Sequence, residues 1–205
     1  MDCGFWIESF DCLRQVSDPE FIEGISRRSL KSQIGKGMKR KMRKPRLFIS
    51  ASEKGITAVG LGGRRGNDSV PSRPRSEPAL ARRWKVAARR ELGAYFAGRL
   101  RSFSASCDLG GLPPFTRTVL KITARIPYGE VKSYRWVAER LRKPKAMRAV
   151  GNALGRNPIP IIIPCHRVVR SDGTLGGYAL GLDWKKRLLD LERSHLGDRP
   201  RGRRI

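Results

Sequence analysis

A proline-containing turn that runs into a short apolar stretch is the feature that most constrains this chain. The turn occupies residues 156–160, Arg-Asn-Pro-Ile-Pro, and three isoleucines follow it at 161–163. Proline fixes its own backbone and restricts the residue before it, so this turn is rigid. It delivers the chain to Cys165 and His166, a thiol beside an imidazole. Because the thiolate is the reactive form of cysteine and an imidazole commonly takes the thiol proton, the segment predicts an activated nucleophile.

Cysteine and histidine are otherwise rare and scattered. The chain has two histidines and four cysteines, which are His166, His195, Cys3, Cys12, Cys107 and Cys165. There is no Cys-x-x-Cys spacing, and the histidines lie far in sequence from Cys3 and Cys12, so we expect no zinc site. Two disulfides are possible in principle, but no signal peptide is visible and we expect reduced thiols and an intracellular protein. No apolar run approaches the length of a membrane span, so none is expected.

The net charge indicates a polyanionic partner. Lysine and arginine number 44 against 18 acidic residues, which gives +26 over 205 residues. Residues 27–46 hold ten of the basic residues and no acidic one. A basic tail on an ordinary domain therefore accounts for part of the charge, but the rest of the chain remains clearly basic. Nucleic acid is the favoured partner.

The length suits one domain of ordinary size or two small ones, and composition divides the chain into five parts. We predict a basic, disordered extension at 1–45, a small α+β domain at 46–105, a linker at 106–113, a C-terminal DNA-binding and active-site domain at 114–193, and a basic tail at 194–205. Within the extension a helix is possible between Asp18 and Ile34. The predicted fold class is α+β, with a sheet-plus-helix domain followed by a mainly helical one.

The first folded part predicts a hairpin and a helix. Two β-prone runs, 47–52 and 55–61, are joined by Glu-Lys-Gly, which suits a hairpin turn. The stretch 62–78, rich in Gly, Arg, Pro and Ser, predicts a loop. Residues 78–100 carry intermittent apolar residues at helical spacing, and Gly98 closes the segment.

The second folded part predicts three helices with short connections. The first covers residues 115–126, and Ser133 caps the second. Pro144 suits the first position of the third, which we expect over 144–154 with Gly155 just past its end. After Cys165 the sequence predicts a glycine-rich loop and a final amphipathic helix, at 172–178 and 182–192.

The second and third of these helices form a helix-turn-helix pattern, which is a weak signal on its own. The third helix carries Lys145 and Arg148 among small residues. Small residues let a helix approach either another helix or a DNA groove closely. The positive charge favours DNA.

Several motifs occur here in the order found in one family. They are FTR at 115–117, IPYGEVKSY at 126–134, RAVGNA at 148–153, RNP at 156–158, PCHRV at 164–168 and GGY at 176–178. Together with ELGAYFAG at 91–98, they resemble the O6-alkylguanine-DNA alkyltransferases, also named methylated-DNA–protein-cysteine methyltransferases. The resemblance covers residues 46–193. It implies a ribonuclease-H-like N-terminal domain and a winged-helix-like C-terminal domain.

The resemblance implies a catalytic role for three residues. Cys165 would attack the alkyl carbon on guanine O6 and keep the alkyl group as a thioether. His166 would accept the thiol proton through a water, and Glu192 would orient the imidazole, as in a catalytic triad. Without the family, a surface helix charge is the commoner fate of a lone glutamate such as Glu192.

The resemblance also implies contacts to DNA. Tyr134 would contact the flipped guanine and crowd the adjacent phosphate, and Arg148 would fill the space that the base leaves. Without the family, we would expect Tyr134 to be a half-buried core residue and Arg148 to be an exposed charge on a helix. The family's helix binds the minor groove, which small flanking residues suit. The further DNA-binding residues would be Ser133, Lys145, Ala149 and Gly151. Asn157 would hinge the helix-turn-helix to the active-site segment, and the pocket would be walled by Pro160, Val168, Tyr178 and Ala179.

The implied function is DNA repair by direct reversal. A methyl or other alkyl group would move once and irreversibly from O6-alkylguanine, and from O4-alkylthymine, in double-stranded DNA to Cys165. We expect a monomer without metal or cofactor and without a membrane partner, in the cytoplasm if bacterial and in the nucleus if eukaryotic. The alternative is a non-catalytic protein that binds alkylated DNA. A Cys–His hydrolase is remote, because no oxyanion hole is recognisable.

Overall fold

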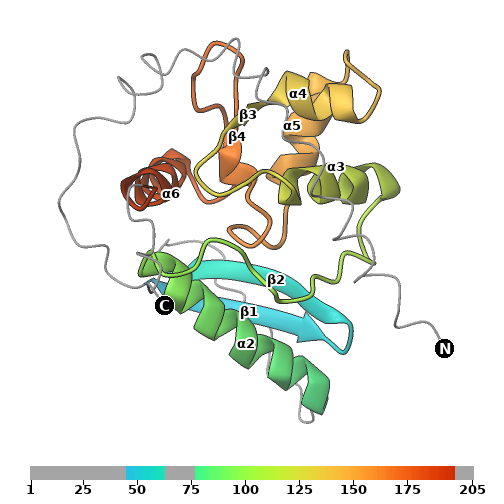
Figure 1. The fold of residues 1–205 in the computed structure, drawn as a ribbon. Coiled ribbons are helices and arrows are strands. Elements are labelled where there is room, and N and C mark those ends of the chain that lie inside the picture. Colours follow the sequence, from blue (N-terminus) through green and yellow to red (C-terminus); the bar gives the residue numbers. More distant parts are fainter. Residues whose placement is uncertain (1–44, 63–76, 197–205) are drawn as a thin grey trace, which may run out of the picture.

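The computed structural model describes residues 45–62 and 77–196, which form a sheet-and-helix unit followed by a mainly helical unit (Figure 1). The predictions for the basic extension, for most of the 62–78 loop and for the end of the basic tail lie outside these residues. Within them the predicted α+β fold class is confirmed. No helix in this described part is both long and apolar enough to cross a membrane.

The first unit is a hairpin covered by one long helix. Strand β1, Arg46–Ser52, pairs antiparallel with β2, Gly55–Gly62, with a bulge between Ser50 and Ala51. This confirms the predicted hairpin. Helix α2, Ala79–Phe96, lies across one face of the sheet (Figure 1). Its buried apolar residues recur at helical spacing and are Ala81, Ala88, Leu92 and Tyr95.

Helix α2 ends at Phe96, two residues before Gly98, which the sequence predicts to close it. The amide of Gly98 bonds to the carbonyl of Tyr95 (2.9 Å), and Gly98 has a φ of +70°, which closes the helix. A Cβ added at Gly98 would also lie 2.2 Å from Nε2 of His195. Glycine therefore lets the end of α2 pack directly on a residue near the C-terminal end of the described chain.

The second unit follows the predicted order of helices. Its elements are α3 (Pro114–Ala124), β3 (Lys132–Ser133), α4 (Tyr134–Arg140), α5 (Met147–Gly155), the 3-10 turn η2 (Cys165–Arg167), β4 (Val168–Val169) and α6 (Leu182–Ser194). The short strands β3 and β4 pair in parallel. The chain that enters α4 therefore lies beside the chain that leaves η2 (Figure 1). This pairing places the helix-turn-helix next to Cys165.

The third predicted helix was placed wrongly at its start. We expected it to begin at Pro144, but α5 begins at Met147. The residues between α4 and α5 form a turn, in which Arg142 has a φ of +56°. Proline suits a turn as well as the first position of a helix, which is why this cue misled. Lys145 therefore lies in an exposed turn rather than on the helix, and Gly155 is the last helical residue.

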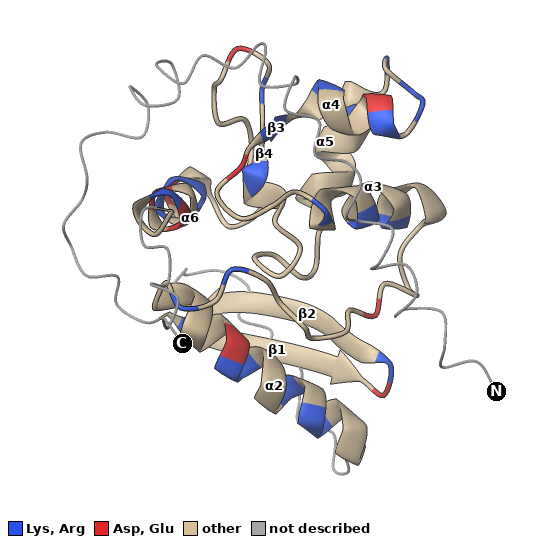
Figure 2. Cartoon of the chain, viewed as in Figure 1, with Lys and Arg blue, Asp and Glu red and all other residues tan. Residues whose placement is uncertain are grey.

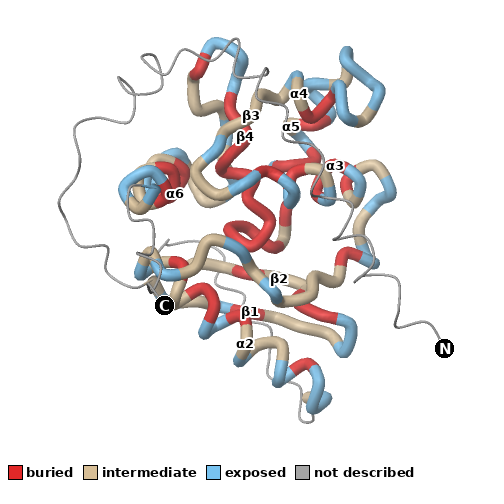
Figure 3. The backbone as a smooth tube through the Cα atoms, in the orientation of Figure 1, coloured by how far each residue is buried: buried red, intermediate tan, exposed pale blue. Residues whose placement is uncertain are grey.

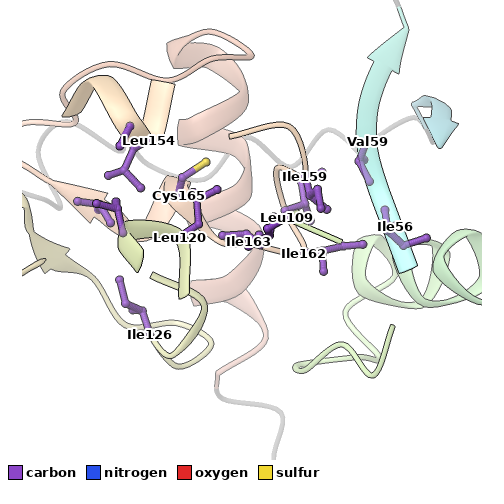
Figure 4. Packing of buried hydrophobic residues seen from close by; sticks show 14 of the residues in the cluster. Ile56, Val59, Leu109, Leu120, Ile126, Leu154, Ile159, Ile162, Ile163 and Cys165 are labelled. Atoms are coloured by element: carbon purple, nitrogen blue, oxygen red, sulfur yellow. The ribbon is translucent and has the colours of Figure 1, made fainter. Parts of the chain in front are cut away.

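One apolar core joins the two units. In Figure 4, Ile56 and Val59 of β2 lie next to Ile159 and Ile162 of the active-site segment, and all four belong to one core cluster. The Val59 amide also donates to the Pro158 carbonyl (2.8 Å). Every residue from 159 to 169 is buried, and Figure 3 shows this buried segment between the sheet and the helices. The proline-containing turn and the isoleucines that follow it thus form the junction between the two units.

Candidate active site

The 3-10 turn η2 holds Cys165 inside the core. Cys165, His166 and Arg167 follow Pro164 directly, and all three side chains are buried. The Arg167 amide bonds back to the Pro164 carbonyl (2.9 Å), which closes the turn. Successive side chains of a 3-10 turn point in different directions. The thiol, the imidazole and the guanidinium therefore reach different partners.

The thiol faces Asn157. Asn157 Nδ2 donates to Cys165 Sγ (3.0 Å) and to the Ile163 carbonyl (3.0 Å), and its Oδ1 accepts from the Ile159 amide (3.0 Å). The backbone bonds are those expected of the hinge, while the contact with sulfur was not predicted. Burial raises the pKa of Cys165, and the Asn157 donor and the charge of Lys185 act against it. The resting cysteine is therefore a thiol, and the Asn157 donor and the Lys185 charge only reduce the cost of forming its thiolate.

A buried pair links His166 to Glu192 on α6. His166 Nε2 lies 2.8 Å from Glu192 Oε1. Burial lowers the pKa of His166, so the imidazole is neutral. Burial raises the pKa of Glu192, but hydrogen bonds from His166 and Arg167 outweigh it and bring the pKa to about 2. The Nε2–H group of His166 therefore donates a hydrogen bond to the carboxylate. The buried Nδ1 has no hydrogen-bond partner and keeps its lone pair.

Glu192 is held by more donors than His166 alone. Arg167 donates to both carboxylate oxygens through Nε (3.0 and 3.2 Å) and to Oε1 through Nη2 (2.8 Å). The Gly129 amide donates to Oε2 (2.9 Å) and the Tyr95 hydroxyl to Oε1 (2.6 Å). Sequence reasoning gave Arg167 no role, although an arginine in a buried segment signals a carboxylate partner. It also gave Tyr95 no role in the site, and placed it only within the 78–100 segment and the motif at 91–98.

Lys185 is a further buried charge that sequence reasoning missed. Its ammonium donates to the carbonyls of Val168 (2.6 Å), Gly177 (3.3 Å) and Leu175. It thereby ties α6 to β4 and to the loop that follows Cys165. Burial lowers the pKa of Lys185 to about 8. Helical spacing was the signal, because the buried face of α6 consists of Lys185, Leu188, Leu189 and Glu192.

Two tyrosines lie around the thiol. Tyr134, the first residue of α4, is half-buried, and a Cβ added at Gly176 would lie 2.8 Å from its hydroxyl. The Tyr178 ring meets the His166 ring edge-on at 6.3 Å, and its buried hydroxyl has no hydrogen-bond partner. Burial, then the charge of Cys165, raises the pKa of both tyrosines. The unpartnered Tyr178 hydroxyl and His166 Nδ1 are polar atoms that a ligand could satisfy.

The helix-turn-helix presents Arg148 to solvent. Ser133 Oγ accepts a backbone amide of α4 (3.0 Å), which confirms the predicted cap. Arg148 and Ala149 are exposed on α5, and Gly151 packs near the Tyr134 ring, 3.8 Å from an added Cβ. Lysine and arginine lie on α3, on α4 and in the turn before α5 (Figure 2).

The remaining predicted site residues lie in different surroundings. Pro160 and Val168 are buried, Tyr178 is half-buried and Ala179 is exposed. Lys145, in the turn before α5, is exposed. Across residues 45–62 and 77–196, no group of three or more His, Cys, Asp or Glu side chains could hold a metal ion.

Known proteins resemble this chain over most of the described part. A family model described as 6-O-methylguanine DNA methyltransferase, DNA binding domain, matches residues 114–194. A methylated-DNA–protein-cysteine methyltransferase of Methanosarcina barkeri is 52% identical over 53% of this chain and 68% of the relative. Another, of Mycolicibacterium paratuberculosis, is 52% identical over 51% of this chain and 63% of its own length.

Solved structures give the same result. OGT of Mycobacterium tuberculosis in complex with DNA has a TM-score of 0.62 and 37% identity, covering 73% of this chain and 87% of that one. An O6-methylguanine DNA methyltransferase of Methanococcus jannaschii has a TM-score of 0.52 and 33% identity, covering 74% and 90%. The chain belongs to the methylated-DNA–protein-cysteine methyltransferase family.

Proposed function

We propose that this chain repairs DNA by moving an alkyl group, once and irreversibly, from guanine O6 to Cys165. The proposal rests on one arrangement: a buried thiol with an amide donor on its sulfur, beside a neutral imidazole that a carboxylate holds. The relatives' shared name describes methylated DNA as the donor and a protein cysteine as the acceptor. Cys107 lacks this arrangement, since its sulfur contacts the Ala105 carbonyl oxygen (3.9 Å), and burial raises its pKa to about 12.

The proposed reaction balances with the side chains present. Cys165 gives its proton to Nδ1 of His166 through a water, and Glu192 stabilises the imidazolium that forms. The sulfur then attacks the alkyl carbon, so that an S–C bond forms and the C–O6 bond breaks with its electron pair staying on guanine. Guanine takes up one proton at N1 in place of the alkyl group, and the imidazolium of His166 gives up its proton through the water, so that His166 ends neutral. A thioether does not hydrolyse back to a thiol, so each molecule acts once.

The guanine has to leave the base stack to meet a thiol that lies inside the protein. Extrusion of a base costs a few kcal/mol and costs least for a damaged, poorly paired one. We assign Arg148, exposed on α5, to the space that the base leaves, and Tyr134 to the flipped guanine and its phosphate. The other proposed DNA contacts are Ser133, Lys145, Ala149 and Gly151. Asn157, Pro160, Val168, Tyr178 and Ala179 complete the proposed hinge and pocket.

We also propose a division of labour within the chain. Residues 46–105 form a supporting domain, 106–113 a linker, and 114–193 the domain that binds DNA and carries the chemistry. The protein acts as a monomer on double-stranded DNA without a cofactor, and O4-alkylthymine is a second substrate. It acts where the genome lies, in the cytoplasm of a bacterium or the nucleus of a eukaryote.

Mass spectrometry of the cysteine peptides tests the transfer. After incubation with a duplex that contains one O6-methylguanine, we expect one methyl on Cys165 and none on Cys107. The Cys165→Ala variant should bind the duplex and gain no methyl. If Cys165 stays unmodified while the lesion duplex is bound, the transfer is wrong and a non-catalytic lesion-binding protein remains.

A further inference from the structure

We propose that Tyr95 is a positioning residue for the proton relay, because its hydroxyl orients Glu192 and sets how tightly this carboxylate holds the proton of His166. The inference deepens the proposed function and rests on it. Tyr95 comes from α2, in the first unit, and lies outside residues 114–194, which the family model matches. The first unit would thus contribute a side chain to the chemistry of the second.

The Tyr95 hydroxyl reaches the relay directly. It donates to Glu192 Oε1 at 2.6 Å, and its oxygen lies 3.4 Å from His166 Nε2. The 2.6 Å bond is a short, charge-assisted one, which is about twice as strong as a bond between neutral groups. Burial raises the pKa of Tyr95 far above its usual range, and the charge of Glu192 raises it further. The hydroxyl therefore keeps its proton and acts as a donor.

Aromatic packing holds the Tyr95 ring in place. Its centroid lies 5.7 Å from that of Phe96, 5.4 Å from Phe103 and 5.9 Å from Tyr128. Tyr95 is 0% exposed, so no water replaces its hydroxyl at Glu192. A donor on a packed ring fixes the direction of the bond that it makes. The carboxylate is consequently oriented from α2 as well as from η2.

Tyr95 and His166 donate to the same oxygen, Oε1 of Glu192. A carboxylate oxygen that accepts more donors is less basic, so it holds an imidazolium proton less tightly. Loss of the Tyr95 hydroxyl leaves more of the negative charge to His166, and the pKa of His166 should rise. The other titratable or charged groups around this pair are Tyr128, Cys165, Arg167, Tyr178 and Lys185.

Tyr95→Phe and Tyr128→Phe form a matched pair of variants. Tyr128 belongs to the same aromatic cluster, but its buried hydroxyl has no hydrogen-bond partner. Both substitutions remove one hydroxyl and keep the ring. NMR titration of the imidazoles in the full chain measures their effect, since only His166 and His195 contribute signals. We expect the pKa of His166 to rise by about one unit in Tyr95→Phe and to stay in place in Tyr128→Phe.

The rate of a single turnover against pH is the second measurement. In Tyr95→Phe the acid limb of the pH–rate profile should move to higher pH by as much as the His166 pKa rises. At pH values below that pKa the rate should fall by up to about tenfold. A purely structural role for Tyr95 would lower stability and leave both quantities unmoved. An unchanged His166 pKa in folded Tyr95→Phe, or an equal rise in Tyr128→Phe, overturns the proposal. A wild-type protein that transfers no alkyl group contradicts the proposed function instead, and the titration still decides the role of Tyr95.

Discussion

Glu192→Gln removes one negative charge from the centre of the fold and keeps the shape of the side chain. The carboxylate accepts hydrogen bonds from Tyr95, Gly129, His166 and Arg167. An amide cannot replace it, because its nitrogen would face other donors. Arg167, which is 5% exposed, would also lose the carboxylate it pairs with. We expect a large loss of stability from a change of one atom.

Two independent arguments give the same magnitude. Removing one partner of a buried ion pair costs about 3–5 kcal/mol of the free energy of unfolding. The pKa of Glu192 is about 2, against an ordinary value of 4.5, and this shift corresponds to about 3 kcal/mol at neutral pH. Because the folded-state pKa is depressed, this stabilisation is complete above pH 4.5 and is lost as the pH falls towards 2. The difference between the two proteins should therefore shrink on acidification.

Urea unfolding of both proteins at pH 7 and at several values below 4.5 measures this difference. Glu130→Gln is the control, since Glu130 pairs with Lys132 (3.2 Å) while its side chain is 52% exposed. An exposed pair should change the free energy of unfolding by less than about 1 kcal/mol. A loss below about 1 kcal/mol in Glu192→Gln, or a loss that does not depend on pH, would refute the reasoning.

Other perturbations test the DNA surface and the loop. Arg148→Ala should slow repair of duplex DNA more than transfer from free O6-benzylguanine, and equal losses in the two assays would exclude the space-filling role. Raising the salt concentration should weaken duplex binding steeply in a titration, because released counterions drive it. Gly176→Ala should lower the thermal midpoint and the transfer rate, since Gly176 has a φ of +64° and an added Cβ would meet the Tyr134 hydroxyl. Gly177→Ala should leave both unchanged, because a Cβ added at Gly177 meets no atom within 4 Å.

Local signals in the sequence predicted most of the fold. The β-prone runs around Glu-Lys-Gly identified the hairpin, and Ser133 identified the start of α4. Each of these cues acts within a few residues, so no knowledge of tertiary contacts is needed. The predicted start of α5 was wrong because the cue was local. Pro144 suits a turn and the first position of a helix equally well, and only the surrounding chain decides between them.

The parts of the site that were not predicted depend on contacts between distant residues. Tyr95 meets Glu192 across 97 positions of sequence, and no local pattern marks a tyrosine as a donor rather than a core ring. The burial of Lys185 could have been predicted from helical spacing, because it lies on the buried face of α6. Its carbonyl partners could not, because they lie in other segments. The roles of Tyr134 and Arg148 remain predictions, since they depend on bound DNA, and the hinge role of Asn157 remains one because it concerns motion.

The depth of Cys165 bears on the protein after its reaction. Its side chain is 4% exposed, and its sulfur accepts a hydrogen bond from Asn157. A methyl group added to this sulfur enters a packed interior, and such overpacking typically costs about 1–3 kcal/mol. The methylated chain should therefore unfold at a lower temperature than the unused one, so its thermal midpoint would reveal what fraction of a sample has already reacted.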